Sequence, residues 1–164
     1  LYAASVAEAL PIGTNSIDVV FISMAFHHFR DPHLAADECR RVLRRHGRVC
    51  LRTACLEKIS MYPYVPFFPA SRPLLERRLP SLAFQREAFE AAGFHTLACD
   101  VVTQQIAPDY SAYADKLAVK ADSILASLDD KDFQAGIKAL RSQAATMARC
   151  AVTEPIDFIV FGKS

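Results

Sequence analysis

The chain has 164 residues, of which 52% are hydrophobic and 23% charged, and its formal net charge is +1. This length and composition indicate one globular domain with a sizeable core. The nearly neutral charge argues against a nucleic-acid partner, which usually requires a strongly basic surface. No apolar stretch reaches the roughly 18 residues needed to cross a membrane. Five scattered cysteines form no CxxC pair and no zinc spacing, which is typical of reduced thiols. We therefore expect a cytoplasmic protein without a membrane partner.

A continuous apolar run is the first strong signal along the chain. The turn formers Gly13-Thr14-Asn15-Ser16 lead into it, and it extends to Met24. A run of this length between turn signals predicts a strand, residues 16–24, that is buried on both faces. A polar cluster with His27 and His28 follows it. Because ligands of open α/β sheets lie at the carboxyl ends of strands, we expect chemistry here.

A helix should follow this cluster. Asp31 is placed to be its N-cap, with Pro32 in the first turn. Its end is expected at His46-Gly47, and its inner face should carry the apolar residues at helical spacing, Ala35, Cys39, Val42 and Leu43. Residues 48–54 are the second predicted strand.

The order and spacing of these elements resemble a class I S-adenosylmethionine-dependent methyltransferase. The most similar branch is methyltransferase type 11, which includes the quinone-biosynthesis C-methyltransferases and many small-molecule methyltransferases. The resemblance is clear over residues 7–53, and it rests on AEALPI (7–12), SIDVVFISMAFHHFRDP (16–32) and RRVLRRHGRVCLRT (40–53).

The resemblance implies methyl transfer from S-adenosylmethionine to a small-molecule acceptor. It places six residues at the cofactor: Val6, Ala7, Glu8, Ser23, Met24 and His28. The family usually has an aspartate before AEALP that binds the adenine amino group, and Val6 stands there in this chain. His28 is our candidate catalytic residue, since a histidine near the transferred methyl group could accept a substrate proton. The alternative for His27 and His28 is packing against the next helix.

No metal site is expected. His27, His28 and His33 could form one by composition alone, but neighbouring loop histidines lack ligand geometry, and no carboxylate or thiolate completes the set.

The family's glycine-rich cofactor loop and the acid that ends its second strand are absent from the chain, which has five glycines and no GxGxG motif. We therefore expect residues 1–164 to be the C-terminal part of a methyltransferase domain that binds cofactor poorly alone. The alternative is a non-catalytic, methyltransferase-like remnant that acts in assembly or binding. Without the missing strands, the edge of strand 16–24 and one sheet face would be uncovered. Such an edge promotes pairing with another chain, including a second copy.

Strand and helix periodicity is lost over residues 55–80. Prolines and aromatic residues predict a long loop there instead of a helix or central strand. Loops of this length are often lids or binding loops, and the resembled family commonly places substrate-facing insertions after this strand. Together with His27, we expect a substrate pocket to be walled by Tyr62, Tyr64, Phe67 and Phe68. Ordinary core packing of these aromatics is the alternative.

The rest of the chain completes the predicted sheet. Residues 81–92 predict a helix with Leu82, Phe84, Ala88, Phe89 and Ala92 on its inner side, and residues 94–106 a third strand. Residues 111–146 predict a helical hairpin that breaks at Asp129-Asp130, an insertion that in the resembled family often covers the active site. Residues 154–162 are the last strand. The expected fold is α/β, the C-terminal part of a Rossmann-like methyltransferase sheet. It has about four strands in the order first, second, fourth, third, with the last strand antiparallel.

Overall fold

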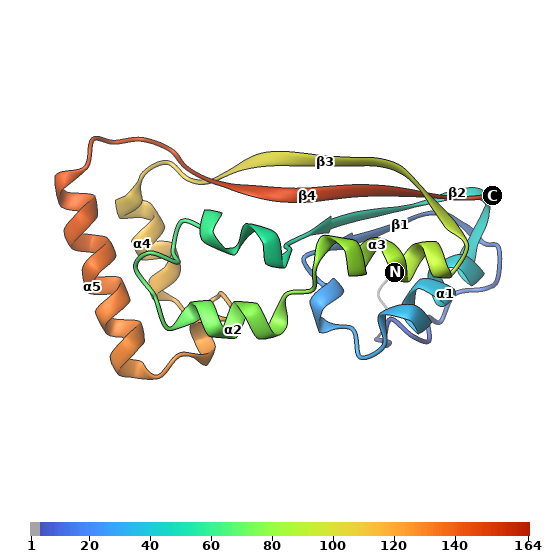
Figure 1. Ribbon diagram of the computed structural model, residues 1–164, viewed down its shortest axis with the longest axis horizontal. Helices are drawn as coiled ribbons and strands as arrows, with labels where there is room; N and C mark the ends of the chain where they lie inside the picture. The colour runs from blue at the N-terminus through green and yellow to red at the C-terminus, as the bar shows by residue number, and fades with distance from the viewer. Residues whose placement is uncertain (1–3) are drawn as a thin grey trace. The chain divides into compact units, whose positions relative to one another are not determined.

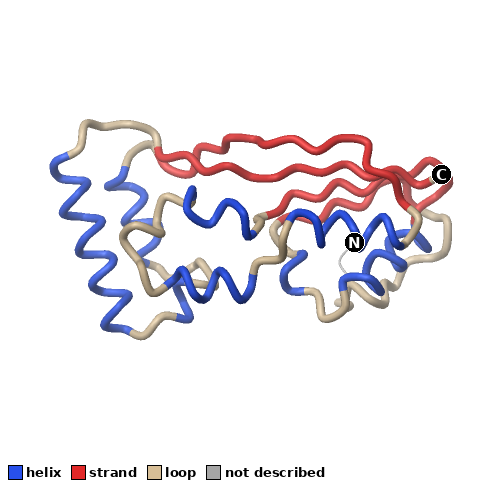
Figure 2. Tube along the Cα trace, viewed as in Figure 1, coloured by secondary structure: helices blue, strands red, loops and turns tan. Residues whose placement is uncertain are grey.

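The computed structural model describes residues 4–164 (Figure 1). Helices follow each of the first three strands along the chain, as expected for an α/β fold, and Figure 2 shows the helices and strands in separate colours. The strands are β1 (Ile17–Ser23), β2 (Leu43–Thr53), β3 (Phe94–Ala107) and β4 (Val152–Lys163). The α-helices are α1 (Pro32–Val42), α2 (Ser71–Arg78), α3 (Leu82–Ala91), α4 (Tyr110–Ala118) and α5 (Asp130–Thr146). Short 3-10 helices lie at Phe26–His28, Leu56–Met61 and Leu125–Ser127.

The four strands form one mixed sheet in the order β1-β2-β4-β3. β1 pairs with β2 in parallel, and β2 pairs with β4 in antiparallel orientation. The predicted α/β class, the predicted strand order and the antiparallel last strand are therefore confirmed.

The chain divides into two compact units. We call the first the sheet unit; it comprises the described part of Leu1–Cys55, together with Pro80–Val102 and Ile156–Ser164. We call the second the helical unit; it comprises Leu56–Leu79 and Thr103–Pro155. Within residues 4–164, no helix is both long enough and apolar enough to cross a lipid bilayer.

The core of the sheet unit lies on one face of the strands. Alternate residues of β2 and β4 reach it, among them Leu51 and Phe161, and α1 and α3 cover it with residues such as Cys39 and Phe89. The rings of Phe89 and Phe161 stack with centroids 4.6 Å apart. Burial of such large apolar side chains is the main favourable term in folding.

The opposite face of β1 is open. Side chains alternate along a strand, so Ile22 is buried whereas Val19 and Phe21 are 55% and 60% exposed. β1 is also the outermost strand of the described sheet. The expected uncovered edge and uncovered face are thus both present in the described residues.

Helix α1 ends earlier than the sequence predicts. Asp31 caps its start as expected and accepts from the backbone N–H groups of His33 and Leu34. The helix stops at Val42 instead of at His46-Gly47. The reason is that groups outside the helix satisfy its last carbonyls: Ser16 N–H donates to Val42 O (2.8 Å), and Lys163 Nζ donates to Arg40 O (2.7 Å).

Helix α3 differs from prediction at one position of its inner face. Phe84 is 40% exposed, whereas Gln85 is fully buried. The side-chain amide of Gln85 donates to Ala54 O (3.1 Å), which offsets the cost of burying a polar group. The predicted inward position of Phe84 is therefore wrong.

The helical unit departs further from prediction. Helix α2 lies within the predicted loop, because Pro73 falls in its first turn, where a missing N–H costs nothing. Helix α4 ends at Ala118 instead of continuing towards Leu128. Lys120 then adopts a left-handed φ of 52°, and Asp122 accepts from the N–H groups of Ile124 and Leu125, which starts a new short turn. Asp129, at the predicted break, caps α5.

Candidate functional site

The carboxyl end of β1 forms a sharp turn. Met24 has a φ of +51°, a conformation that non-glycine residues rarely adopt. Its N–H donates to Arg52 O (2.8 Å), and the Arg52 guanidinium donates to Ser23 Oγ (3.3 Å). Phe26 is 1% exposed and anchors the next turn against Phe89, with ring centroids 6.1 Å apart. The positions of the residues predicted to line the cofactor site at this turn are therefore set by neighbours on both sides.

The two histidines follow directly on a 3-10 helix. Their ring centroids lie 4.0 Å apart, with His27 half-buried and His28 exposed. The N–H of His28 donates to Ala25 O (2.9 Å). His28 can therefore meet a group that approaches from solvent, which a proton acceptor requires.

Glu8 holds this turn from the other side. Its Oε1 accepts from the N–H groups of Arg30 (2.9 Å) and Asp31 (3.0 Å). The hydrogen bond from Asp31 is the largest cause of the lowered pKa of the Glu8 carboxyl. Glu8, which the resemblance places at the cofactor, thus links the predicted cofactor segment to the start of α1 by hydrogen bonds. Its contact with a cofactor stays a prediction.

A second ionic contact, which sequence reasoning missed, fixes the residues that follow. Arg41 forms a hydrogen-bonded ion pair with Glu38 (2.6 Å) and donates to Leu10 O (3.1 Å) and Ile12 O (2.9 Å). Glu38 in turn accepts from Leu10 N–H (2.9 Å). The Arg41 bond lowers the pKa of Glu38 to about 2. The i,i+3 spacing of the pair is visible in the sequence, but its backbone partners, which are 28 to 31 residues away, are not.

An open pocket of about 470 Å³ lies beside β1, and we call it the β1 pocket. Its volume is in the range of small-molecule sites. It brings together two of the predicted cofactor residues, Ala7 and Ser23. The full lining is Ala7, Leu10, Val20, Phe21, Ile22, Ser23, Ala25, Phe29 and Cys39.

Other predicted cofactor residues lie outside this lining. Val6 is 49% exposed and forms an isolated bridge with Ala9. Glu8, Met24 and His28 are also absent from the lining. The mostly apolar pocket fits a flat heterocycle such as adenine better than it fits a charged group.

Thiol chemistry is not apparent at the site. None of the five cysteines forms a disulfide within residues 4–164, and burial raises the pKa of the Cys39 thiol to about 12. Cys55, which is fully buried, donates to the buried carboxylate of Asp157 (2.8 Å). Buried thiols of this kind are usually inert.

The aromatic residues of the predicted substrate pocket lie in the helical unit, whereas His27 lies in the sheet unit. Tyr62 and Phe68 are 5% and 1% exposed. The ring of Phe68 packs against Phe133, with centroids 5.9 Å apart. Phe67 is half-buried, and its ring contacts Tyr110 at 6.1 Å. Core packing accounts for Phe68, and Tyr64 lines a pocket within the helical unit.

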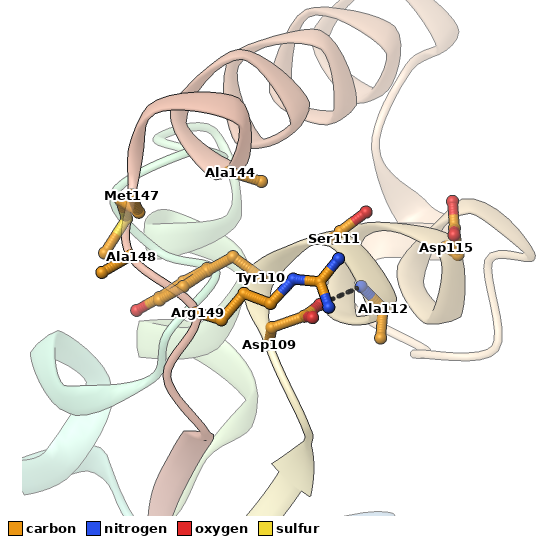
Figure 3. Close-up of a pocket in the computed structure, with 9 residues that line it drawn as sticks. All are labelled: Asp109, Tyr110, Ser111, Ala112, Asp115, Ala144, Met147, Ala148 and Arg149. Atoms are coloured by element: carbon orange, nitrogen blue, oxygen red, sulfur yellow. Dashed lines mark hydrogen bonds between the residues drawn. The ribbon is translucent and has the colours of Figure 1, made fainter.

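Figure 3 shows another pocket of the helical unit, between the start of α4 and the end of α5. The hydrogen bond drawn in it joins Asp109 Oδ1 to Ala112 N–H (2.8 Å) and is the N-cap of α4. Its remaining polar side chains, such as Ser111 and Arg149, are exposed. We assign no chemistry to it. Across residues 4–164, no three His, Cys, Asp or Glu side chains are grouped closely enough to hold a metal ion.

The described sheet is mixed, because the antiparallel strand β4 lies between β2 and β3, and a pocket lies beside β1. Residues 2–51 match a family described as "Methyltransferase domain". Malonyl-[acyl-carrier protein] O-methyltransferase of Methylococcus capsulatus is 35% identical over 95 residues, which are 52% of this chain and 34% of that protein. The chain therefore spans about a third of the length of this curated relative.

Solved structures agree with this class. A protein of Anabaena variabilis assigned as a methyltransferase of an antibiotic biosynthesis pathway matches 96% of this chain and 71% of its own, with a TM-score of 0.70 and 16% identity. The [4+2]-cyclase SpnF matches 98% of this chain and 56% of its own, with a TM-score of 0.58 and 19% identity. At such identities the likeness establishes the fold. Sequence and fold together confirm the resemblance to class I S-adenosylmethionine-dependent methyltransferases.

Proposed function

We propose that this chain is part of an enzyme that transfers a methyl group from S-adenosylmethionine to a small-molecule acceptor. One observation carries the proposal: every residue that lines the β1 pocket lies within residues 2–51, the segment that matches a methyltransferase domain. The apolar lining suits the adenine ring, and the backbone of Ala7 and the hydroxyl of Ser23 supply polar contacts.

The chain's own residues would mainly align the reactants. S-adenosylmethionine supplies an already activated methyl group on a sulfonium leaving group, so orientation accounts for much of the catalysis. The exposed imidazole of His28 would take the proton that a carbon or oxygen acceptor must lose. The rigid turn between Ser23 and Phe26 would keep that imidazole near the pocket.

We also propose that tight donor binding needs a glycine-rich loop that these 164 residues do not contain. The absence of any GxGxG motif and the exposed apolar Val6 support this view. An adenine amine without a carboxylate partner would lose about 1–3 kcal/mol.

The test is a transfer assay with methyl-labelled S-adenosylmethionine on this chain and on any longer polypeptide that contains it. Malonyl thioesters are the first acceptors to try, because the curated relative acts on malonyl-acyl carrier protein. With an acceptor that must lose a proton, such as a phenol, His28→Gln should lower turnover by about 10²–10⁴-fold, whereas the ionised carboxylate of a malonyl thioester needs no base. His33→Gln, a histidine in α1 whose side chain is 45% exposed, is the matched control and should leave turnover unchanged. Equal turnover in both variants would remove His28 from the mechanism.

A second candidate function is assembly without catalysis. The exposed Val19 and Phe21 on an outermost strand favour it, and the cyclase among the structural neighbours illustrates that this fold serves other reactions. The chain should then self-associate in light scattering, and Phe21→Lys should abolish the association. Val119→Lys, at a 73% exposed position of the helical unit, should not. A monomer at all concentrations would contradict the assembly role.

A further inference from the structure

Five arginines lie within residues 40–48, and two of them have no partner in the protein. Neither Arg45 nor Arg48 forms a hydrogen bond or an ion pair with another residue of 4–164. The other three are held by protein groups, in the pairs Arg40 with Gly93 O (2.7 Å), Arg41 with Glu38 (2.6 Å) and Arg44 with Asp18 (2.8 Å). Arg45 and Arg48 both line one pocket of about 370 Å³, which we call the arginine pocket.

An irregularity in β2 brings these two side chains to the same pocket. In a regular strand, residues three positions apart point to opposite faces of the sheet. Here β2 advances five residues, from 43 to 48, between two of its pairs with β1, while β1 advances only two, from 17 to 19. Within the extra residues, His46 has a left-handed φ of 65°. Bulges of this kind redirect side chains, which explains how Arg45 and Arg48 come to line one pocket.

Gly162 of β4 forms the floor of the arginine pocket. It is the cross-strand neighbour of Arg48, and a Cβ built on it would lie 2.8 Å from Nε2 of His95. The imidazole of His95 therefore lies directly over the glycine, and both Arg48 and His95 line the pocket. A glycine within a strand often marks a place where another group approaches the backbone closely.

The charge of the arginine pocket is positive. Among the described residues, no Asp or Glu side chain belongs to its lining. Its third cation, Lys163, donates to Arg40 O (2.7 Å), so we leave its ammonium out of the balance. A carboxylate at the end of Ser164 would offset one guanidinium group and leave the other. His46 and His95 also belong to the lining, and imidazoles supply ring N–H donors. An excess positive charge of this kind attracts an anion.

We propose that the arginine pocket binds the phosphate group of a small phosphate monoester. Guanidinium donors match the spacing of phosphate oxygens and bind them in pairs, so two unpaired arginines favour a dianion over a single carboxylate. The volume is in the range of small-molecule sites, and Leu97, which is 49% exposed, supplies an apolar wall for the organic part of the ester. All lining residues belong to the sheet unit. The proposal does not depend on methyl transfer.

Calorimetric titration of the chain with phenyl phosphate tests the proposal, with phenol and benzoate as matched ligands. Phenyl phosphate should bind saturably and at least about tenfold more tightly than either, because only it carries a dianion that both guanidinium groups can share. Inorganic phosphate should bind more weakly, because it lacks the ring that contacts Leu97. Equal binding of inorganic phosphate would overturn the ester and assign the pocket to free phosphate.

The Arg45→Gln Arg48→Gln double variant should bind phenyl phosphate about tenfold or more weakly. Its Tm without ligand should stay near that of the wild type, because neither side chain has a protein partner. The Arg77→Gln Arg149→Gln double variant is the matched control: it removes the same charge at exposed positions of the helical unit and should bind like the wild type.

Gly162→Ala tests the floor of the pocket and should also weaken binding, because the added Cβ would push the His95 ring aside. Absence of saturable phenyl phosphate binding, equal binding of benzoate, or unchanged affinity in the Arg45→Gln Arg48→Gln variant would each overturn the proposal. Tighter binding of a hexaglutamate peptide than of phenyl phosphate would overturn it in favour of an acidic protein surface.

Discussion

The sheet unit and the helical unit are stabilised by different kinds of packing. In the sheet unit, residues at regular strand and helix spacing, such as Leu51 and Phe89, meet in one apolar cluster. In the helical unit, aromatic residues without regular spacing pack on each other, as Phe68 does on Phe133. Regular spacing can be recognised along the sequence, whereas aromatic contacts between distant segments depend on the final structure.

Removing one central ring from each unit should have the largest effect. Phe89→Ala and Phe68→Ala should each cost about 3–5 kcal/mol of unfolding free energy, because both rings are almost fully buried. Hydrogen exchange should show the loss of protection confined to the unit that carries the substitution. If either variant lost hydrogen-exchange protection equally in both units, the two units would unfold as one and would not be stabilised separately.

A smaller but more specific effect is expected at Gly136 in α5. A Cβ at this position would clash with Cδ1 of Phe68, a nearly fully buried ring. Gly136→Ala should therefore destabilise the helical unit by about 1–3 kcal/mol, although alanine is normally the better helix former. Gly13→Ala is the control, since its Cβ would meet nothing closer than 3.8 Å. A gain of stability in Gly136→Ala would show that Phe68 can move aside.

The Glu38–Arg41 pair should make the unfolding free energy of the sheet unit depend on pH. Because the Arg41 bond lowers the pKa of Glu38 from 4.5 to about 2, its contribution is fully present above pH 4.5 and is lost as the pH falls through 2. After allowance for solvent screening, Glu38→Gln should cost about 1–2 kcal/mol at pH 7. The difference from wild type should close between pH 4.5 and 2. Glu87→Gln, at a side chain that is 59% exposed, is the control and should leave the stability at pH 7 nearly unchanged.

The smallest effects are expected at helix N-caps, one in each unit. Ser81 accepts from Phe84 N–H (3.1 Å) at the start of α3, and Asp129 accepts from Asp132 N–H (2.8 Å) at the start of α5. Ser81→Ala and Asp129→Ala should each cost about 1 kcal/mol in urea unfolding. A loss of 3 kcal/mol or more at either position would mean that the side chain does more than cap its helix.

The sequence predicts most of the sheet unit. The apolar run of β1, the Asp31 cap and the strand order are confirmed, because each depends on local spacing or on the topology of the resembled family. The predicted end of α1 is wrong by about a turn. The last carbonyls of the helix accept hydrogen bonds from Ser16 and Lys163, and no local sequence pattern reveals these partners.

The helical unit and its pockets could be predicted only in part. Helix α2 was missed because prolines and aromatics hide its short pattern. Tyr113 on α4 lines a pocket of the helical unit together with Tyr64 and Glu154, which are 49 and 41 residues away along the chain. The polar character of that pocket is therefore a property of the folded chain.

An NMR titration with S-adenosylhomocysteine would locate the donor site on the chain. Amide shifts detect even weak binding, which is what we expect of these 164 residues alone. The account predicts saturable shifts that cluster around the β1 pocket, at Ala7, Ser23 and Ala25. Shifts confined to the helical unit, or none at millimolar ligand in any polypeptide that contains the chain, would contradict it.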